Sequence, residues 1–190
     1  MISEELRSRA LALVEPHRTA HVEGAASEAE HLAVRWGADV DDAVTAALLH
    51  DCTKYIKNAE QLKLCEQYGI IVTRDERESP AVLHALSGAE YAAREFGVPP
   101  HIADAIRTHT TGAPDMTLLQ SIIYLADIIE PTRNFPGVDE LRSLAYTDLR
   151  AALIAAASRT ISYLCADRRA VHPATVDTYN ALLRLEADAE

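Results

Sequence analysis

The segment from Asp42 to Lys54 constrains the fold of this chain more than any other. Its centre reads AVTAALL and is nearly all apolar, and the polar run HDCTK follows directly. A helix that is apolar around most of its circumference belongs inside a domain. Asp41 is of the residue type that caps a helix N-terminus, so we expect the helix to begin there. The sequence therefore predicts a buried helix that presents His50 and Asp51 at its C-terminal end.

The rest of the chain has the spacing of helices rather than strands. Val22, Ala25 and Ala29 recur at helical spacing, and Gly37 can end that helix. Val, Thr and Tyr do not cluster in alternating runs, as strands would require. A length of 190 residues suits one domain, and 48% hydrophobic residues supply its core. We predict one all-α domain over 1–190, with a loop at 70–80 and helices at about 4–14, 18–36, 42–54, 58–68, 80–96, 100–109, 117–129, 139–145, 147–167 and 173–187.

Charge and cysteine content restrict the cellular compartment and the classes of partner that we expect. The 29 acidic residues outnumber the 18 basic ones, and the formal net charge of −11 repels nucleic acid. The three cysteines form no CxxC pair, which favours a reducing compartment over a disulfide framework. The N-terminus lacks the apolar stretch of a signal peptide, and the longest apolar run, 151–157, is too short to span a bilayer. We expect a cytoplasmic protein without membrane or nucleic-acid partners.

Polar residues embedded in apolar helical segments are the candidate functional residues. The set consists of four histidines and two aspartates: His21, His50, Asp51, His84, His109 and Asp127. Imidazole and carboxylate ligands suit iron, manganese or zinc. Each histidine alone is more often a hydrogen-bonded core residue, but a carboxylate inside IIYLADIIE costs several kcal/mol unless it is paired or metal-bound. The combination therefore indicates a metal site in a helical bundle.

Basic and hydroxyl side chains lie near these residues in the sequence. Lys54 follows Asp51 by three residues, which places its ammonium beside the site or, alternatively, in solvent at a helix end. Arg133 can bind phosphate through two hydrogen bonds or lie in a surface loop. Further candidates are Arg18 for substrate, Glu130 for orienting a ligand, and the turn of Thr110, Thr111 and Gly112 for phosphate. The remaining histidines are expected to be structural or on the surface: His17, His31, His101 and His172.

Five segments together resemble the YqeK family of HD-domain proteins. They are RTAH at 18–21, AALLHDCTK at 46–54, LHALSGAEYA at 83–92, AIRTHTTG at 105–112 and MTLLQSIIYLADIIEPTRNFPGV at 116–138. The HTTG and LADIIEPTR parts are the most specific. The resemblance covers about 18–180 and implies an all-α HD-domain helical bundle, with a core at about 18–135 and helices of 137–187 packed on it.

The resemblance also implies an activity and its residues. YqeK proteins are symmetrical diadenosine tetraphosphate hydrolases with an iron-containing centre. By position, one metal would be held by His21, His50, Asp51 and Asp127, and Asp51 would bridge to a second held by His84 and His109. The expected reaction is attack by a metal-activated water that gives two ADP. Catalytic roles fall to Asp51, Lys54 and Arg133, and substrate contacts to Arg18, Lys54, Thr110, Thr111, Gly112 and Arg133.

Several alternatives stay open from the sequence. The metals are expected to be iron, with manganese or another transition metal as the alternative. The enzyme could instead be another HD-type phosphohydrolase, such as a nucleotidase, a dNTP triphosphohydrolase or a cyclic-nucleotide phosphodiesterase. A catalytically silent nucleotide sensor is the alternative outside enzymes. The expected partners are a small nucleotide substrate and an ADP- or GDP-like product, and a homodimer is left open.

Overall fold

The computed structural model describes residues 4–187, and within this range every regular element is a helix. This confirms the all-α prediction. None of these helices is long and apolar enough to cross a membrane. The elements are α1 Glu4–Leu11, η1 Pro16–Arg18, α2 Thr19–Trp36, α3 Val40–Leu49, α4 Asn58–Gln67, α5 Arg74–Glu78, η2 Pro80–Val82, α6 Leu83–Glu95, α7 Pro100–Thr108, α8 Leu118–Ile129, α9 Val138–Thr147, α10 Leu149–Ala166 and α11 Pro173–Ala187.

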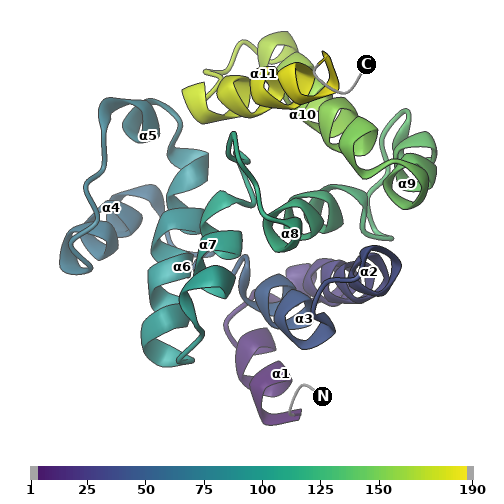
Figure 1. Cartoon of the computed structure of the whole chain (residues 1–190). Helices are drawn as coiled ribbons and strands as arrows, with labels where there is room; N and C mark the ends of the chain where they lie inside the picture. Colours follow the sequence, from purple (N-terminus) through teal and green to yellow (C-terminus); the bar gives the residue numbers. More distant parts are fainter. Residues whose placement is uncertain (1–3, 188–190) are drawn as a thin grey trace.

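Helix α3 is the central element of the fold, as the sequence predicts. Every residue from Ala43 to Leu49 is buried, and α3 packs against α2, α7 and α8 (Figure 1). Its bounds differ from the expectation at both ends. The N-cap is Asp39, whose side chain accepts a hydrogen bond from the Asp42 amide at 2.9 Å, rather than Asp41. The helix ends at Leu49, so the HDCTK residues form a turn.

That turn is held in place by buried hydrogen bonds to its neighbours. The side-chain amide of Gln61 on α4 donates to the Thr53 carbonyl at 2.6 Å. The Thr53 hydroxyl donates to the His84 carbonyl on α6 at 3.0 Å and lies 2.9 Å from the Ser87 hydroxyl. Because these partners satisfy the carbonyl and the hydroxyl of Thr53, the chain can leave the helix without leaving these two buried groups unpaired. The turn can therefore direct His50 and Asp51 inwards.

The segment 70–80, expected to be a loop, contains the short helix α5. A capping box explains this helix: Glu76 accepts hydrogen bonds from both the amide and the hydroxyl of Thr73, and the Thr73 side chain caps the third residue in return. The T-x-x-E pair of residues 73–76 is the sequence signature of this box. The next long helix, expected from about residue 80, begins at Leu83, because the short helix η2 at Pro80–Val82 precedes it.

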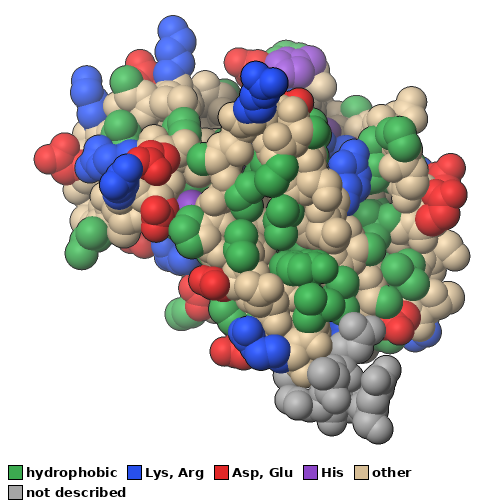
Figure 2. Space-filling view, turned by 90° about the horizontal axis from the view of Figure 1, so that it is seen from above, with side chains coloured by type: hydrophobic (Ala, Val, Ile, Leu, Met, Phe, Trp, Pro, Cys, Tyr) green, Lys and Arg blue, Asp and Glu red, His purple; other side chains and the backbone are tan. Residues whose placement is uncertain are grey.

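The C-terminal helices pack on the rest of the bundle. Helix α10 contacts α8, α9 and α11, and Trp36 on α2 donates from its indole to the Ala145 carbonyl on α9 at 2.8 Å. Helix α11 crosses the top of the molecule (Figure 1). Seen from that side, the surface shows a patch of hydrophobic side chains bordered by charged ones (Figure 2). Exposed Val176 and Leu183 lie on α11.

The turn after α7 connects the bundle to α11. Gly112 has a φ of +68°, and a Cβ there would lie 2.6 Å from the Cγ2 atom of Thr178. Thr178 is fully buried, and its hydroxyl donates to the Thr111 carbonyl at 3.2 Å and to the Ala174 carbonyl at 2.7 Å. Figure 1 shows this turn reaching up to α11. Gly112 therefore allows the segment after His109 to dock on the C-terminal helices.

We predict that Gly112→Ala destabilises the protein by about 2–3 kcal/mol, through left-handed strain together with the clash against Thr178. Gly97→Ala is the matched control. Gly97 has nearly the same φ of +66° but nothing within 4 Å of its Cβ position, so this change should cost only about 1 kcal/mol. Chemical denaturation measures both. Equal losses would show that the contact with Thr178 does not matter.

Candidate metal centre

Three of the histidines are fixed in the same way by the helix turn before them. In each, Nδ1 lies 2.7 Å from a backbone carbonyl oxygen three residues earlier, in the pairs His50–Ala47, His84–Ala81 and His109–Ile106. A carbonyl can only accept a hydrogen bond, so Nδ1 carries the proton and donates it. The neutral ring then has its Nε2 lone pair free. This is the tautomer that a metal ligand requires.

His21 is oriented by a carboxylate instead of a carbonyl. Its Nδ1 lies 3.0 Å from Oε1 of Glu130, which is fully buried and also accepts from the amide and hydroxyl of Thr132 at 2.6 and 2.5 Å. Burial raises the pKa of Glu130, but the hydrogen bonds from Thr132 and His21 outweigh it and lower the pKa. A Cβ at Gly24 would lie 2.6 Å from Glu130 Oε2. Glycine at this position therefore lets α2 approach the carboxylate.

The four free imidazole nitrogens converge in two pairs. His21 Nε2 lies 3.2 Å from His50 Nε2, and His84 Nε2 lies 3.1 Å from His109 Nε2. All four side chains are buried. With Nδ1 protonated, two lone pairs face each other at close range, and this arrangement is repulsive unless a proton or a cation lies between them.

The two aspartates complete the cluster. Asp127 Oδ1 lies 3.2 Å from His21 Nε2 and 3.7 Å from His50 Nε2. The two oxygens of buried Asp51 face different histidines. Its Oδ2 lies 3.6 Å from His21 Nε2 and 3.4 Å from His50 Nε2. Its Oδ1 lies 3.1 Å from His84 Nε2 and 3.7 Å from His109 Nε2. Asp51 therefore stands between the two histidine pairs.

The cluster keeps its carboxylates charged. Burial opposes ionisation of Asp51 and Asp127, but the surrounding imidazoles hold the pKa of both well below its usual range. Burial also opposes charge on His21, yet Asp127, Asp51 and Glu130 raise its pKa to about 9. His84 differs, because burial lowers its pKa to about 4. In the protein without metal, a proton on His21 thus offsets part of the negative charge that a cation would neutralise.

The donor set fits metal ions. Ligand atoms of His21, His50 and Asp127 all lie within 4.8 Å of one another, and so do those of His50, Asp51 and His109. Buried Asp51 Oδ1 has no aligned hydrogen-bond donor, as expected of an atom that serves another ligand. Cys52 does not take part. Burial raises the pKa of its thiol to about 12, and its Sγ lies 3.7 Å from the Gly88 carbonyl oxygen.

A pocket of about 710 Å³ opens beside the cluster, and we call it the C-terminal pocket. Helices α10 and α11 form one wall. His109 and Asp127 lie at its base, with four of the predicted substrate residues: Lys54, Thr110, Thr111 and Arg133. Lys54 Nζ lies 3.1 Å from His84 Nε2, and Arg133 donates to Asp127 Oδ1 at 2.6 Å. The hydroxyl oxygen of Thr110 is buried without a hydrogen-bond partner.

The other two predicted substrate residues lie elsewhere. Arg18 is outside the C-terminal pocket and is bonded to Asp51 Oδ2. Gly112 packs on Thr178 and is not among the lining residues of the pocket.

The sequence interpretation missed the wall formed by the C-terminal helices. Tyr163, Arg169 and His172 line the pocket, although His172 was expected to be structural or on the surface. Its Nε2 is buried without a hydrogen-bond partner, whereas Nδ1 accepts from the Ala174 amide at 3.2 Å. The available signal was the basic run RRAVHP between two helices, because loops on a rigid scaffold often carry binding residues.

Comparison with known proteins agrees with this geometry. The family profile of the HD domain matches residues 18–132. A protein of Halalkalibacterium halodurans named symmetrical bis(5'-nucleosyl)-tetraphosphatase is 41% identical over 186 residues, covering 93% of this chain and 97% of the relative. A Bacillus subtilis protein of the same name is 43% identical over 188 residues, covering 93% and 97%.

A crystal structure supports the fold in the same way. It is described as a predicted HD superfamily hydrolase involved in NAD metabolism from Clostridium acetobutylicum. It matches with a TM-score of 0.92 at 33% identity and covers 97% of this chain and 98% of that one. The family profile, the relatives of nearly full length and the shared fold together show that this chain belongs to the HD-domain family, as a YqeK-like member.

Proposed function

We propose that this protein hydrolyses diadenosine tetraphosphate at the middle of its phosphate chain and releases two ADP. The observation that carries the proposal is the position of Asp51, whose two oxygens face two separate histidine pairs next to the C-terminal pocket. The activity itself follows from the curated relatives of nearly full length, which are named symmetrical bis(5'-nucleosyl)-tetraphosphatases.

The six ligand residues would hold two metal ions. His21, His50 and Asp127 would bind one ion, His84 and His109 the other, and Asp51 both. Such ions supply an activated water as nucleophile and neutralise charge on the phosphoryl oxygens. The nitrogen and oxygen donors suit iron or manganese, and we propose iron. Glu130, which holds the His21 ring from behind, would act by orienting that ligand.

Lys54 and Arg133 are the cations placed to bind the phosphates. Both line the C-terminal pocket, and both already contact a proposed metal ligand. With Asp51 and Asp127 engaged as metal ligands, the Lys54 ammonium and the Arg133 guanidinium would be available to phosphoryl oxygens. Their role is to position the chain and stabilise charge in the transition state. The ADP leaving group needs little protonation, so no protein acid is required.

The C-terminal pocket would hold one nucleoside diphosphate. Its volume of about 710 Å³ lies within the usual range for ligand sites. Arg169 and His172 supply polar groups far from the metal cluster in sequence, and Thr110 supplies an unpartnered hydroxyl. Together with Lys54 and Arg133, these groups would offer the phosphates contacts from several segments that line the pocket. The bond that is cleaved would then lie where the pocket meets the metal cluster.

Product analysis tests the proposed reaction. The metal-loaded protein is incubated with dinucleoside tri-, tetra- and pentaphosphates and with a deoxynucleoside triphosphate, and early products are separated by chromatography. We expect ADP alone from diadenosine tetraphosphate. Equimolar ATP and AMP would place the cleaved bond elsewhere in the chain. Free phosphate from a mononucleotide would favour a nucleotidase, and tripolyphosphate would favour a triphosphohydrolase.

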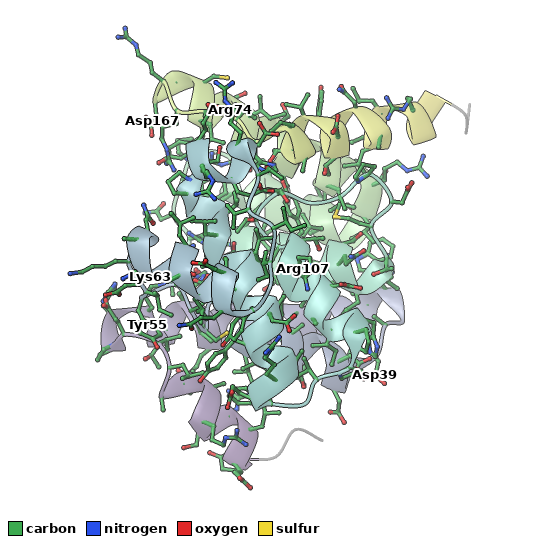
Figure 3. The ribbon with its side chains drawn as sticks, turned by 90° about the vertical axis from the view of Figure 1, so that its left-hand side faces the viewer. Asp39, Tyr55, Lys63, Arg74, Arg107 and Asp167 are labelled. Atoms are coloured by element: carbon green, nitrogen blue, oxygen red, sulfur yellow. The ribbon has the colours of Figure 1, made fainter. Side chains whose placement is uncertain are left out.

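We predict that Lys54→Ala and Arg133→Ala each lower turnover by about 10²–10³-fold, because each removes one charge that stabilises the transition state. Metal content should stay near the wild-type level, since neither side chain can bind a cation. Activity assays together with metal analysis measure both effects. Lys63→Ala is the control: Lys63 lies on α4 and points away from the molecule (Figure 3). Loss of metal in the Lys54 or Arg133 variant would contradict the assigned role.

A further inference from the structure

The substrate of the proposed function carries two identical nucleosides, and this inference rests on that function. If one nucleoside diphosphate occupies the C-terminal pocket, the other must leave the metal cluster on another side. A second cavity of about 260 Å³ lies there, which we call the N-terminal cleft. Its lining includes Asp51 and Lys54 from the centre, together with Val14, Glu15, His17, Arg18 and Tyr55. Lys54 lines both cavities, so they meet at the metal cluster.

Each cavity has a half-exposed tyrosine in its lining. Tyr163 of the C-terminal pocket is 50% exposed, and Tyr55 of the N-terminal cleft is 52% exposed. Figure 3 separates the two regions: Tyr55 lies low, beside the purple N-terminal helices, while Asp167, which follows α10, lies at the top. An exposed aromatic ring is a surface on which any nucleobase can stack. The two tyrosines thus suit the two bases of a symmetrical substrate.

Arg18 supplies the phosphate contact on this side. Its guanidinium is bonded to Asp51 Oδ2, and its Nε is buried without a hydrogen-bond partner. Arg18 also lines a cavity of about 420 Å³ together with Arg133, so basic groups continue from the C-terminal pocket past the cluster. Glu15 also lines the cleft, and its Oε2 lies 3.3 Å from His17 Nδ1. Because Arg18 contacts Asp51, a proposed metal ligand, its guanidinium is close enough to the cluster to bind the phosphate next to the cleaved bond.

We propose that the N-terminal cleft binds the second nucleoside diphosphate, with Arg18 on its phosphates and Tyr55 under its base. A volume of 260 Å³ is below the range of about 300–1,000 Å³ that encloses whole ligands. The cleft therefore encloses the phosphates and ribose, and the base lies on the outer surface against Tyr55. This half of the site is open and tolerates any base, and its stack on Tyr55 is available only to substrates that carry two nucleosides.

The test compares substrates with two nucleosides and with one. Steady-state kinetics of the metal-loaded enzyme are measured with diadenosine tetraphosphate, with adenosine 5'-tetraphosphate and with ADP as inhibitor. Tyr55→Ala should raise KM for diadenosine tetraphosphate about 10-fold, the effect of a lost base stack, with kcat little changed. KM for adenosine tetraphosphate and the inhibition constant of ADP should change by less than about twofold. The Tyr55→Ala variant should also bind an analogue with a methylene group at the central bridge about 10-fold more weakly than the wild type does, as measured by equilibrium binding.

Two further variants make the result specific. Tyr55→Phe keeps the ring and should restore the wild-type KM. Tyr163→Ala, the matched change in the C-terminal pocket, should weaken all three ligands alike. The proposal is overturned if Tyr55→Ala weakens ADP as much as the dinucleotide, or changes neither. A wild-type enzyme that leaves diadenosine tetraphosphate intact would overturn the proposed function itself, and this inference with it.

Discussion

The site depends on four imidazole rings whose Nε2 atoms the fold directs at one another in two pairs. Carbonyls at the helix ends hold three rings with Nδ1 protonated, and Glu130 holds the fourth. Facing Nε2 atoms 3.1 and 3.2 Å apart are stable only with protons or cations between them. The buried α3, the hydrogen-bonded turn after it and the approach of α2 at Gly24 all serve to hold this arrangement. The cluster is therefore consistent with metal binding, and a cation held between the rings would relieve the repulsion between their lone pairs.

The proposed metal ligands and part of the pocket lining come from two different parts of the chain. The match to the HD domain ends at residue 132, and all six proposed ligands lie within it. One wall of the C-terminal pocket comes from α10, α11 and the segment between them, outside that match, and the rest of the lining comes mostly from within it. The proposed metal ligands thus lie in the family core, whereas the later helices add one wall of the pocket beside them. Gly112 and Thr178 connect the two parts directly after the ligand His109. A shared HD fold alone would not specify the substrate, because function depends on the site.

Much of this was predictable because strong local signals agreed with the tertiary structure. The apolar run of α3 predicted its burial, and polar groups inside apolar helices predicted the cluster of His21, His50 and Asp127. The prediction of helix bounds was wrong where two neighbouring residues were equally suitable. Asp39 and Asp41 are equally good caps by residue type, so the sequence does not decide between them. The capping box of Thr73 and Glu76 stabilises a short helix in a segment that is otherwise polar. The pocket wall at His172 had only the basic run RRAVHP as a local signal, because the wall forms only when α11 folds back over the turn after α7.

The central claim is that the six residues form a centre for two metal ions bridged by Asp51. The most direct test is a crystal structure of protein reconstituted with iron or manganese, with anomalous scattering recorded at the absorption edge of the metal. The account predicts two peaks about 3.5–4 Å apart. One should contact His21 and Asp127, the other His84 and His109, with an oxygen of Asp51 on each. A single peak, or ions that Asp51 does not touch, would contradict it.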